Sequence, residues 1–503
     1  MKKWITKTSL LLLSAVFVLS ACSSKSNNTA SPSPAATSGE STSPAAETLS
    51  PANLTWYITG GSAQPDQQVV TDEINKYLED KLPNTTLEFK FVDFGSYDQK
   101  LNPVIAANET FDMMFITRDW LQKYEPNVKK GALLDITDLL EKHAPNLRHK
   151  IMPESFWEDM KAVDGKIYAV PNYQIAAKAN GFVVQKRFAD KYNLDPSKIN
   201  KLEDMEPFFE AVKKGEQDIT PFINKDGFIW FDAFEPSTWI YKNDKTYKQN
   251  VIEFTPEYKK LTELARSWYT KGYINEDAAT IKSLDPIQAK GNWAAMWNNT
   301  LKPGGEVEIK AKSGGNDVIY VPLDKEPVFT GVSSAMTAIS KTSKHPERAL
   351  MFLDLLNTDP KLFNLVAHGI EGKHYTKVKD NYVQPVENSA YNPATDWVFG
   401  NQFIGYLTGD MAPDVWEKTK KLNESAVDPI TRGFVFNSDP VKAEVAALNA
   451  IMDEYNRGML TGTLDPAKYL PIFTDKLKAA GREKILAEEQ KQLDEFFMKK
   501  GLK

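Results

Sequence analysis

Short apolar runs alternate along this chain with stretches in which apolar residues recur every three or four positions. The first runs, at residues 54–59, 86–91 and 111–116, are typical of β-strands. The intervening residues 69–82 have one apolar face and end at Pro83, and residues 97–107 follow the same helical pattern. This alternation predicts a βαβαβ opening and an α/β protein with mainly parallel sheets.

The same alternation continues through the later chain. Further strands are predicted at residues 181–184, 228–231, 293–297, 318–321 and 334–339, with helices at residues 204–214, 256–271 and 346–356. The last sixty or so residues differ, because residues 440–456, 465–480 and 482–498 all have helical periodicity. We therefore expect additional C-terminal helices rather than another sheet.

The N-terminus has the features of an export signal. Lys2, Lys3 and Lys7 precede an apolar run at residues 10–19, which is too short to span a bilayer. Leu-Ser-Ala-Cys, ending at Cys22, resembles the bacterial lipobox, in which the thiol receives a lipid. We predict a signal peptide at residues 1–21 and lipidation of Cys22; an ordinary secreted protein with a chance cysteine is the alternative.

Composition supports an exported, tethered protein. Cys22 is the single cysteine of the chain, so no internal disulfide can form. Residues 22–52 are mostly Ser, Pro, Ala, Thr and Asn and are predicted to form a disordered linker. The net charge of −6 argues against a nucleic-acid partner.

Several motifs occur in an order that resembles one known family. They are FDMMFI (111–116), KGALLDI (130–136), DGKIYAVP (164–171), TGVSSAM (330–336) and GIEGKHY (369–375). The chain resembles extracellular solute-binding proteins of ABC importers, in the sugar-binding branch of large Gram-positive lipoproteins, distantly similar to maltose-binding protein. The resemblance implies a two-lobed periplasmic-binding-protein-like fold of type II, with a hinge and a ligand cleft. We expect residues 53–171 plus 322–375 in one lobe and residues 172–321 plus 376–503 in the other.

The first candidate site follows the strand at residues 111–116, because ligands bind beyond the carboxyl ends of parallel strands. Arg118, Asp119 and Trp120 lie there. The resemblance places Asp119 in line with an acid that binds sugar hydroxyls, and Trp120 offers an apolar face for a sugar ring. Alternatively, Asp119 caps a helix and Trp120 packs against its first turn.

The second lobe supplies further aromatic candidates. Trp297 and Asn298 end the strand at residues 293–297, whereas Trp293 at its start is expected in the core. Trp230 and Trp239 flank acidic residues in a loop-like stretch. Weaker candidates for ligand contact are Tyr173 and Ser333.

Catalytic and metal motifs are missing from the sequence. His368, Glu371 and His374 suggest a metal site, but the glycines between them argue against a helix that would align them. We instead expect Glu371 and His374 to contact ligand near the hinge or cleft, and we predict no cofactor, no metal and no catalytic residue.

The resulting hypothesis is a monomeric, lipid-anchored binding subunit on the outer face of a Gram-positive membrane. It would bind a carbohydrate, most simply an oligosaccharide, and deliver it to ABC permease subunits. Two alternatives stay open: a surface glycoside hydrolase, which would need a pair of carboxylates, and a peptide-binding importer subunit or sensor.

Overall fold

The computed structural model describes residues 49–60, 64–118 and 120–503. The predicted signal peptide, the predicted lipidation site Cys22 and the candidate ligand residue Asp119 lie outside the described residues, as does almost all of the predicted linker.

The first sheet has five strands in the order β2-β1-β3-β11-β4. Strands β2, β1 and β3 are parallel, and β11 runs antiparallel to both β3 and β4. The strands are β1 (Ala52–Gly60), β2 (Thr85–Asp93), β3 (Met113–Ile116), β4 (Ala169–Pro171) and β11 (Met336–Ile339). All four residues of β3 are buried, as expected for a strand with both faces covered. The predicted βαβαβ opening is confirmed.

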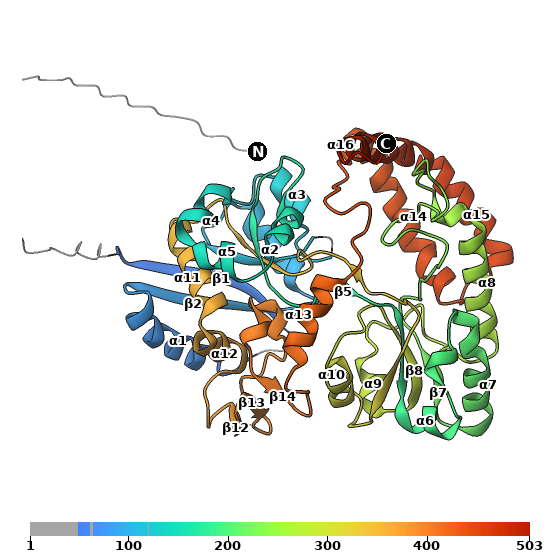
Figure 1. Ribbon diagram of the computed structural model, residues 1–503, viewed down its shortest axis with the longest axis horizontal. Coiled ribbons are helices and arrows are strands. Elements are labelled where there is room, and N and C mark those ends of the chain that lie inside the picture. The colour runs from blue at the N-terminus through green and yellow to red at the C-terminus, as the bar shows by residue number, and fades with distance from the viewer. Residues whose placement is uncertain (1–48, 61–63, 119) are drawn as a thin grey trace, which may run out of the picture. The chain divides into compact units, whose positions relative to one another are not determined.

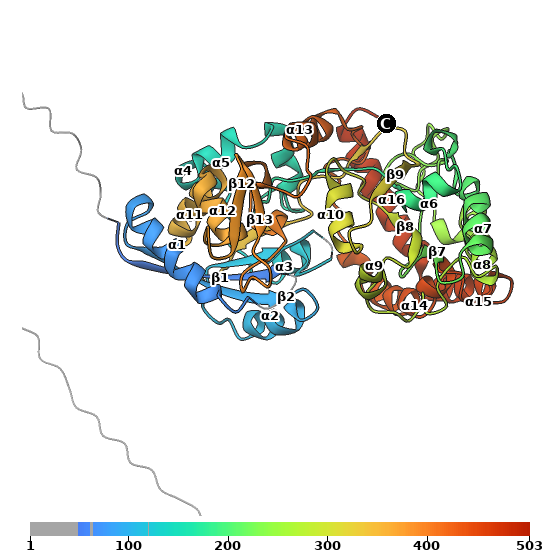
Figure 2. The same ribbon diagram turned by 90° about the horizontal axis from the view of Figure 1, so that it is seen from below.

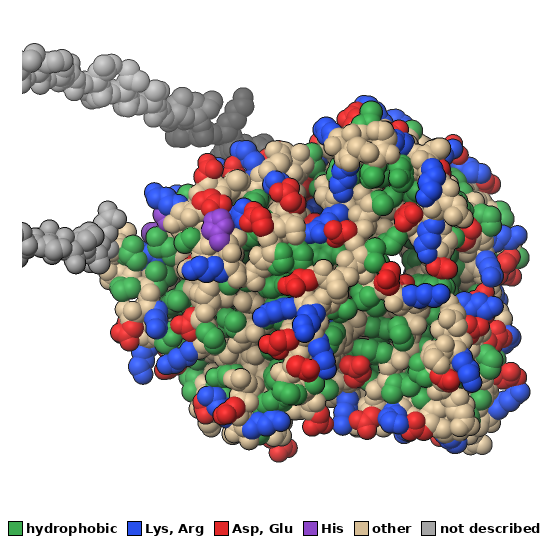
Figure 3. Space-filling view, in the orientation of Figure 1, with side chains coloured by type: hydrophobic (Ala, Val, Ile, Leu, Met, Phe, Trp, Pro, Cys, Tyr) green, Lys and Arg blue, Asp and Glu red, His purple; other side chains and the backbone are tan. Residues whose placement is uncertain are grey.

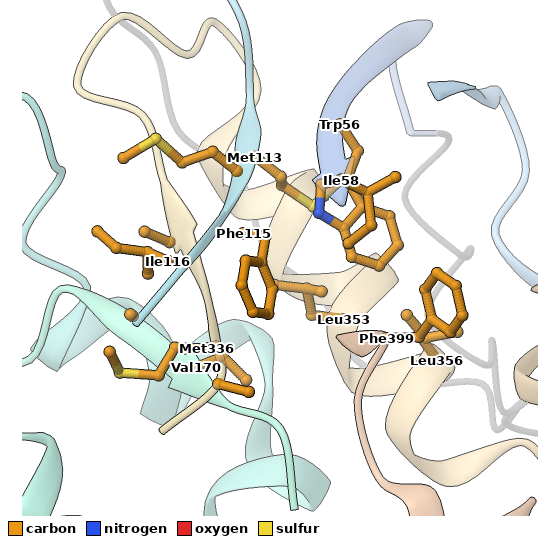
Figure 4. Close-up of a cluster of buried hydrophobic side chains, with 14 of the residues drawn as sticks. Trp56, Ile58, Met113, Phe115, Ile116, Val170, Met336, Leu353, Leu356 and Phe399 are labelled. Carbon is orange, nitrogen blue, oxygen red and sulfur yellow. The ribbon is translucent and has the colours of Figure 1, made fainter. Parts of the chain in front are cut away.

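The first core forms where this sheet meets its covering helices. Trp56 on β1 packs against Phe89 with ring centroids 5.5 Å apart, and against Phe352 of a covering helix at 6.0 Å. Figure 4 shows Phe115 and Leu353 gathered with neighbouring apolar side chains in this core. Apolar burial of this kind is the main favourable term in folding.

Each helix of this lobe buries one face, as the periodicity predicts. In α1 the buried residues are Val70, Thr71, Ile74 and Leu78, spaced three or four apart. The helices are α1 (Gln67–Lys81), α2 (Tyr97–Ala106), α3 (Tyr124–Lys129), α4 (Thr137–His143), α5 (Pro145–Lys150), α11 (Pro346–Thr358), α12 (Pro360–His368) and α13 (Val415–Ser425), with 3₁₀ turns η1 (Glu154–Met160), η5 (Asp396–Val398) and η6 (Gln402–Ile404). Figures 1 and 2 show a small sheet next to α12, formed by β12 (Tyr375–Lys379), β13 (Tyr382–Pro385) and β14 (Leu407–Thr408).

The second sheet has four strands in the order β7-β8-β6-β9. Here β6 is the reversed strand, antiparallel to β8 and β9, while β7 and β8 are parallel. The strands are β6 (Gly181–Gln185), β7 (Thr220–Ile223), β8 (Trp293–Asn298) and β9 (Val318–Pro322). Each large sheet therefore contains one strand that runs against its neighbours.

A second core lies under this sheet and is rich in aromatic rings. Phe209 stacks on Phe222 at 5.4 Å and meets Trp268 edge-on at 5.0 Å. Helix α8 begins at Pro256, where the Thr255 side chain accepts a hydrogen bond from Tyr258 N. The helices are α6 (Lys186–Lys191), α7 (Glu206–Gly215), α8 (Pro256–Thr270), α9 (Asp285–Lys290) and α10 (Gly305–Lys312), with 3₁₀ turns η2 (Pro196–Lys198), η3 (Leu202–Met205) and η4 (Ile252–Phe254).

The predicted C-terminal helices are confirmed as α14 (Lys442–Leu460), α15 (Pro466–Ala479) and α16 (Arg482–Lys499), which follow the 3₁₀ turn η7 (Asp439–Val441). Figure 1 shows α14 and α15, in orange to red, beside α8. Met459 and Phe473 are buried in the second core. These helices therefore belong to the second lobe.

Three segments connect the lobes. The first segment contains strand β5 (Ala177–Lys178), which pairs antiparallel with β10 (Val328–Phe329) of the second segment. The third segment joins them at Val427, whose carbonyl oxygen accepts a hydrogen bond of 2.9 Å from Phe329 N. We call residues 172–180, 323–335 and 426–438 the crossing segments, residues 49–171 plus 336–425 lobe 1, and residues 181–322 plus 439–503 lobe 2.

The predicted lobe boundary at residue 375 is wrong. Tyr391, Val398, Phe399 and Phe403 are all buried in the first core, although they were predicted to lie in the second lobe. Phe399 meets Phe91 of β2 at a centroid distance of 6.2 Å. The chain thus returns to lobe 2 about fifty residues later than predicted, through the third crossing segment.

The strand predicted at residues 228–231 is also wrong. The structure forms a strand at Thr220–Ile223 instead, and residues 228–231 leave the sheet through a turn. Pro221 made the real strand hard to recognise, but β7 is an edge strand, where proline is tolerated. Residues 228–231 are consequently available to line a cavity.

The described surface is mixed in charge. Acidic and basic side chains are interspersed over the face shown in Figure 3. Among residues 49–60, 64–118 and 120–503, every helix is too short or too polar to cross a bilayer.

Replacing Phe399 by alanine should lower the free energy of unfolding by about 3–5 kcal/mol, because a buried aromatic ring is lost from the first core. Urea unfolding monitored by circular dichroism measures this change. The exposed Val378 is the control, and V378A should alter stability by less than about 0.5 kcal/mol. Equal effects of F399A and V378A would contradict the assignment of residues 391–403 to the first core.

Candidate functional site

Both sheets direct the carboxyl ends of their parallel strands toward the crossing segments. The first residue of β11, Met336, pairs with the last residue of β3, Ile116. The first residue of β6, Gly181, pairs with Asn298 and Pro322, the last residues of β8 and β9. Ligands of open α/β sheets bind at such ends, and clefts between lobes are common small-molecule sites. The candidate site therefore lies where the lobes meet.

A small cavity of about 170 Å³ joins the two lobes at the crossing segments. Arg118 and Asp159 line it from lobe 1, Ser237 from lobe 2, and Thr330 and Arg432 from the crossing segments. We call it the hinge cavity.

Arg118 is held on one side of the hinge cavity by hydrogen bonds to uncharged groups. Its Nε donates to Ser333 Oγ at 2.6 Å, and its NH2 donates to the carbonyl oxygen of Asp159. Its backbone N donates to the Ser333 carbonyl oxygen at 2.9 Å. Arg118 and Ser333, both predicted ligand contacts, thus bind each other and connect the end of β3 to the second crossing segment.

Arg432 fastens the third crossing segment to lobe 1. Its NH2 lies 3.4 Å from Asp159 Oδ2, and its guanidinium lies 4.0 Å from the centroid of the Phe329 ring. Burial raises the pKa of the Asp159 carboxyl, and the nearby Arg432 and Arg118 guanidiniums oppose that rise. This ion pair is more buried than most pairs in the protein.

Three aromatic side chains form a platform at the carboxyl edge of the first sheet. Phe94 stacks on Trp397 with centroids 5.9 Å apart and planes 9° apart, and Trp120 lies 6.1 Å from Phe94 and 6.3 Å from Trp397. Trp120 Nε1 donates to the Ser334 carbonyl oxygen at 3.1 Å, while 45% of the residue stays exposed. The aromatic platform, Phe94, Trp120 and Trp397, therefore offers a fixed apolar surface.

Of the three platform residues, only Trp120 was predicted from the sequence. Trp397 lies in the 3₁₀ turn η5, within residues that were assigned to the other lobe. Phe94 follows directly after β2, so its position at the carboxyl end of a parallel strand was a usable signal. Trp397 does not follow a parallel strand, so its sequence position did not indicate a site residue.

The largest cavity of this region, about 900 Å³, is lined by Trp230 and Trp239 of lobe 2 together with residues of the crossing segments. Trp230 Nε1 donates to Asp324 Oδ1 at 2.8 Å, while the backbone and side-chain amides of Asn180 donate to Asp324 Oδ2 at 2.7 Å. Trp239 meets Phe234 edge-on at 5.8 Å. Both tryptophans are half-buried and held in place. We call this the Trp230 cavity.

Trp297 and Asn298 line a neighbouring cavity of about 650 Å³, the Trp297 cavity. The Trp297 ring meets Phe182 at 5.3 Å and Phe228 at 6.2 Å, and Asn298 Oδ1 accepts a hydrogen bond from Thr300 N at 2.7 Å. Trp293, at the start of β8, is fully buried. The structure thus places three predicted tryptophans and one predicted asparagine beside two adjoining cavities.

Tyr173 lies in the first core instead of lining one of these cavities. Only 2% of the residue is exposed, and its ring meets Phe403 edge-on at 4.7 Å. Burial raises the pKa of its hydroxyl to about 12. Its place beside the crossing segment suggested ligand contact, but the packing of residues 391–403 covers it.

Glu371 and His374 lie in the loop before β12, on lobe 1. His374 Nδ1 accepts a hydrogen bond from Ile370 N at 2.9 Å, and its Nε2 lies 3.1 Å from Asp66 Oδ2. Glu371 pairs with Lys377 at 3.2 Å. Within the described ranges, no group of three or more His, Cys, Asp or Glu side chains is placed to hold a metal ion. Both residues are thus engaged within lobe 1, and neither lines the hinge cavity, the Trp230 cavity or the Trp297 cavity.

Comparison with known proteins identifies relatives over most of the chain. A carbohydrate ABC transporter substrate-binding protein of Streptococcus pneumoniae serotype 4 (strain ATCC BAA-334 / TIGR4) is 30% identical over 440 residues, covering 85% of this chain and 87% of its own length. The polygalacturonan/rhamnogalacturonan-binding protein YtcQ of Bacillus subtilis (strain 168) is 23% identical over 402 residues, covering 74% and 78%.

Solved structures of solute-binding proteins also resemble this chain over most of its length. The N-glycan transport solute-binding protein NgtS of Streptococcus pneumoniae superposes with a TM-score of 0.77 at 27% identity, covering 89% of this chain and 99% of NgtS. Its complex with Man5GlcNAc superposes with a TM-score of 0.72 at 27% identity over the same shares of the two chains. The two-lobed fold expected from the sequence is confirmed.

Two family models match the chain. Residues 430–498, the C-terminal helical region, match a domain of unknown function, DUF3502. The model of the bacterial extracellular solute-binding proteins matches residues 60–361, more than half of the chain. The chain therefore belongs to the family of bacterial extracellular solute-binding proteins.

Proposed function

We propose that this protein is the lipid-anchored binding subunit of an ABC importer and that it binds a neutral oligosaccharide between its lobes. The observation that carries the proposal is the pair of aromatic surfaces at the carboxyl edges of the two sheets. Lobe 1 presents the aromatic platform, and lobe 2 presents Trp230, Trp239 and Trp297. The carbohydrate-binding relatives support the same reading.

A sugar ring suits such surfaces because it has an apolar C–H face and a rim of hydroxyls. The indole rings would pack on the face, and side-chain amides such as Asn298 and Asn299 can donate to and accept from the rim. A ligand that contacts both lobes favours the conformation in which they approach each other. The crossing segments, joined side by side at Val427, are the natural hinge.

The charges around the Trp230 cavity favour a neutral ligand over an acidic one. Its lining has no excess of positive charge, because the bases are Lys178, Lys242 and Lys325 and the acids are Asp232, Glu235, Asp324 and Glu326. Lys242 is paired with Asp232 at 2.7 Å. A polyanionic sugar would leave its carboxylates without cationic partners here, which is unfavourable.

The glycoside hydrolase alternative has less support. A hydrolase needs one protonated and one ionised carboxyl facing the scissile bond. Asp324 accepts three hydrogen bonds from Trp230 and Asn180, and Asp232 is paired with Lys242, so both are engaged in holding the cavity wall. The family and the named relatives are binding proteins.

The proposal includes a lipid anchor in the membrane and ABC permease subunits as partners. The Leu-Ser-Ala-Cys sequence ending at Cys22 supports lipidation, and the following Ser/Pro-rich linker would let a monomeric binding protein reach its permease subunits on the outer face of the membrane.

Neutral oligosaccharides should raise the Tm of the purified protein by about 2–5 °C at saturating concentration, because a ligand that binds only the native state stabilises it. Differential scanning fluorimetry with Man1GlcNAc, Man5GlcNAc and malto-oligosaccharides tests this. Galacturonate oligomers and short peptides serve as comparisons. A shift with peptides alone, or sustained cleavage of the sugars, would contradict the proposal.

Replacing Trp120 by alanine should weaken binding of the best sugar from that screen about tenfold or more, because half-exposed stacking surface is lost from the aromatic platform. Isothermal titration calorimetry measures the change. Trp416, a half-buried tryptophan whose Nε1 donates to the Gly405 carbonyl oxygen at 3.0 Å, is the matched control. W416A should keep wild-type affinity; the same loss in both variants would point to unfolding and not to a stacking contact.

Replacing Cys22 by serine should release the protein from the membrane, because no thiol remains to carry the lipid. Fractionation of cells producing each form, with immunodetection, gives the distribution between membrane and medium. Membrane retention of C22S equal to that of the wild type would rule out the anchor.

A further inference from the structure

The third crossing segment differs from the other two in how its ends are held. The first segment leads from β4 to β6 and the second from β9 to β11, so strands of the large sheets hold both ends of each. The third segment leads from α13 to η7. In Figure 1 it runs, in orange, from α13 toward α16. Contacts of its own residues must therefore hold its conformation.

Lobe 1 holds the third crossing segment on one side. Arg432 NH2 donates to the Ser155 carbonyl oxygen at 3.1 Å, in addition to its pairing with Asp159. Lys129 Nζ donates to Asn437 Oδ1 at 2.8 Å. Both ends of the stretch from Arg432 to Asn437 are thus attached to lobe 1.

Helix α16 of lobe 2 holds the same stretch on the other side. Gln492 Oε1 accepts a hydrogen bond of 2.8 Å from Asn437 N, and Gln492 Nε2 donates to the Asn437 carbonyl oxygen at 2.9 Å. The Phe496 ring meets the Phe434 ring edge-on, with centroids 5.6 Å apart. A pair of backbone hydrogen bonds and an aromatic contact therefore join α16 to the crossing segment.

These contacts come from one face of the helix. Lys500, directly after α16, donates from Nζ to the Arg432 carbonyl oxygen at 2.9 Å. Gln492, Phe496 and Lys500 are spaced four residues apart, which places side chains on the same helix face. We call these three residues the α16 stripe. The α16 stripe faces the third crossing segment.

Helix α16 is itself fixed to lobe 2. Leu493 and Phe497 are buried together with Ile240. Helix α14 of the same C-terminal region ends at Leu460, which contacts Gly227 of lobe 2. The α16 stripe is therefore carried by a well-packed part of lobe 2.

A cavity of about 850 Å³ lies between α16 and lobe 1. Lys161 and Val163 line it from lobe 1, and Lys491 and Glu495 line it from α16. Residues 432–435 of the third crossing segment line it as well. Because this segment is attached to both sides, α16 and lobe 1 can move relative to each other only if the segment bends or loses contacts.

We propose that α16 restrains the hinge: the α16 stripe holds the third crossing segment in one conformation and so narrows the range of lobe orientations in the unliganded protein. Hinge motions are absorbed by φ/ψ changes in a few loop residues, and this segment is such a loop. With the restraint in place, a ligand has less conformational freedom to remove when it binds.

The restraint gives a role to the region that matches a domain of unknown function. That match covers residues 430–498, so it includes most of the third crossing segment that is held together with the helix that holds it. The inference concerns the protein without ligand and goes beyond the proposed function.

Spin labels on the two lobes measure the restraint directly. Cys22 is the single native cysteine, so a chain carrying C22S can be labelled at chosen positions. V378C in lobe 1 and I472C in lobe 2 both replace exposed residues. Double electron–electron resonance on the unliganded protein then gives the distribution of distances between the lobes. Q492A should broaden this distribution and Q492A/K500A should broaden it further, because anchors of the crossing segment are lost.

Gln490 provides the matched control. Like Gln492, it makes two backbone hydrogen bonds, but both go to lobe 2 itself. It accepts from Gln249 N at 2.7 Å and donates to the Tyr247 carbonyl oxygen at 3.2 Å. Q490A removes an equivalent group of α16 without touching the third crossing segment, so the distance distribution should stay as it is in the labelled parent.

Hydrogen exchange followed by mass spectrometry gives the local readout. Asn437 N loses its acceptor in Q492A, so the amides of residues 433–437 should exchange about tenfold or more faster than in the wild type. Q490A should leave their exchange unchanged.

Faster exchange in Q492A without a broader distance distribution would mean that the contact is only local, and it would overturn the restraint. Equal broadening in Q490A and Q492A would also overturn it, because any loosening of α16 would then have the same effect. If Q492A does not fold, as judged by circular dichroism, K500A alone should broaden the distribution and an unchanged distribution rejects the restraint. These measurements need no sugar, so rejection of the restraint leaves the proposed function intact, and failure of saccharides to bind leaves the restraint intact.

Discussion

The architecture depends on the hydrogen bonding of two reversed strands. Strand β11 enters lobe 1 between β3 and β4, and β6 enters lobe 2 between β8 and β9, each running against its neighbours. Because a reversed strand begins where its parallel neighbours end, the chain must cross between lobes at the carboxyl edges of both sheets. The strand pairing therefore determines where the crossing segments lie, and the candidate binding surfaces lie around them.

Where the crossing segments meet the two lobes, the charged side chains bind other groups of the protein, whereas aromatic rings stay exposed and can contact a ligand. Arg118, Arg432, Asp159 and Asp324 are all engaged within the protein, where they join crossing segments to their lobes or fix a tryptophan. The exposed surfaces are indole faces and amides. This division suits a protein that must grip a ligand firmly enough to change conformation and still release it unchanged, because stacking and neutral hydrogen bonds are individually modest.

Much of this arrangement could be predicted from local sequence pattern. Periodicity identified the strands of the opening motif and the three C-terminal helices, and the rule that sites follow parallel strands pointed to Trp120 and Trp297. Contacts distant in sequence could not be predicted: Trp397 joins the aromatic platform only because residues 391–403 return to the first core. Likewise, Tyr173 and His374 were predicted to contact ligand, and their packing against Phe403 and pairing with Asp66 could not be predicted from the sequence.

Gly227 lies in the wall of the Trp297 cavity and contacts Leu460, which belongs to the region that matches a domain of unknown function. Gly227 has a φ of +93°, and a Cβ there would lie 2.3 Å from Leu460 Cβ and 3.0 Å from the Leu460 backbone, so a smaller side chain at position 460 would not make room for a larger residue at position 227. The C-terminal helices therefore act as a scaffold for this part of the wall and not as an independent appendage.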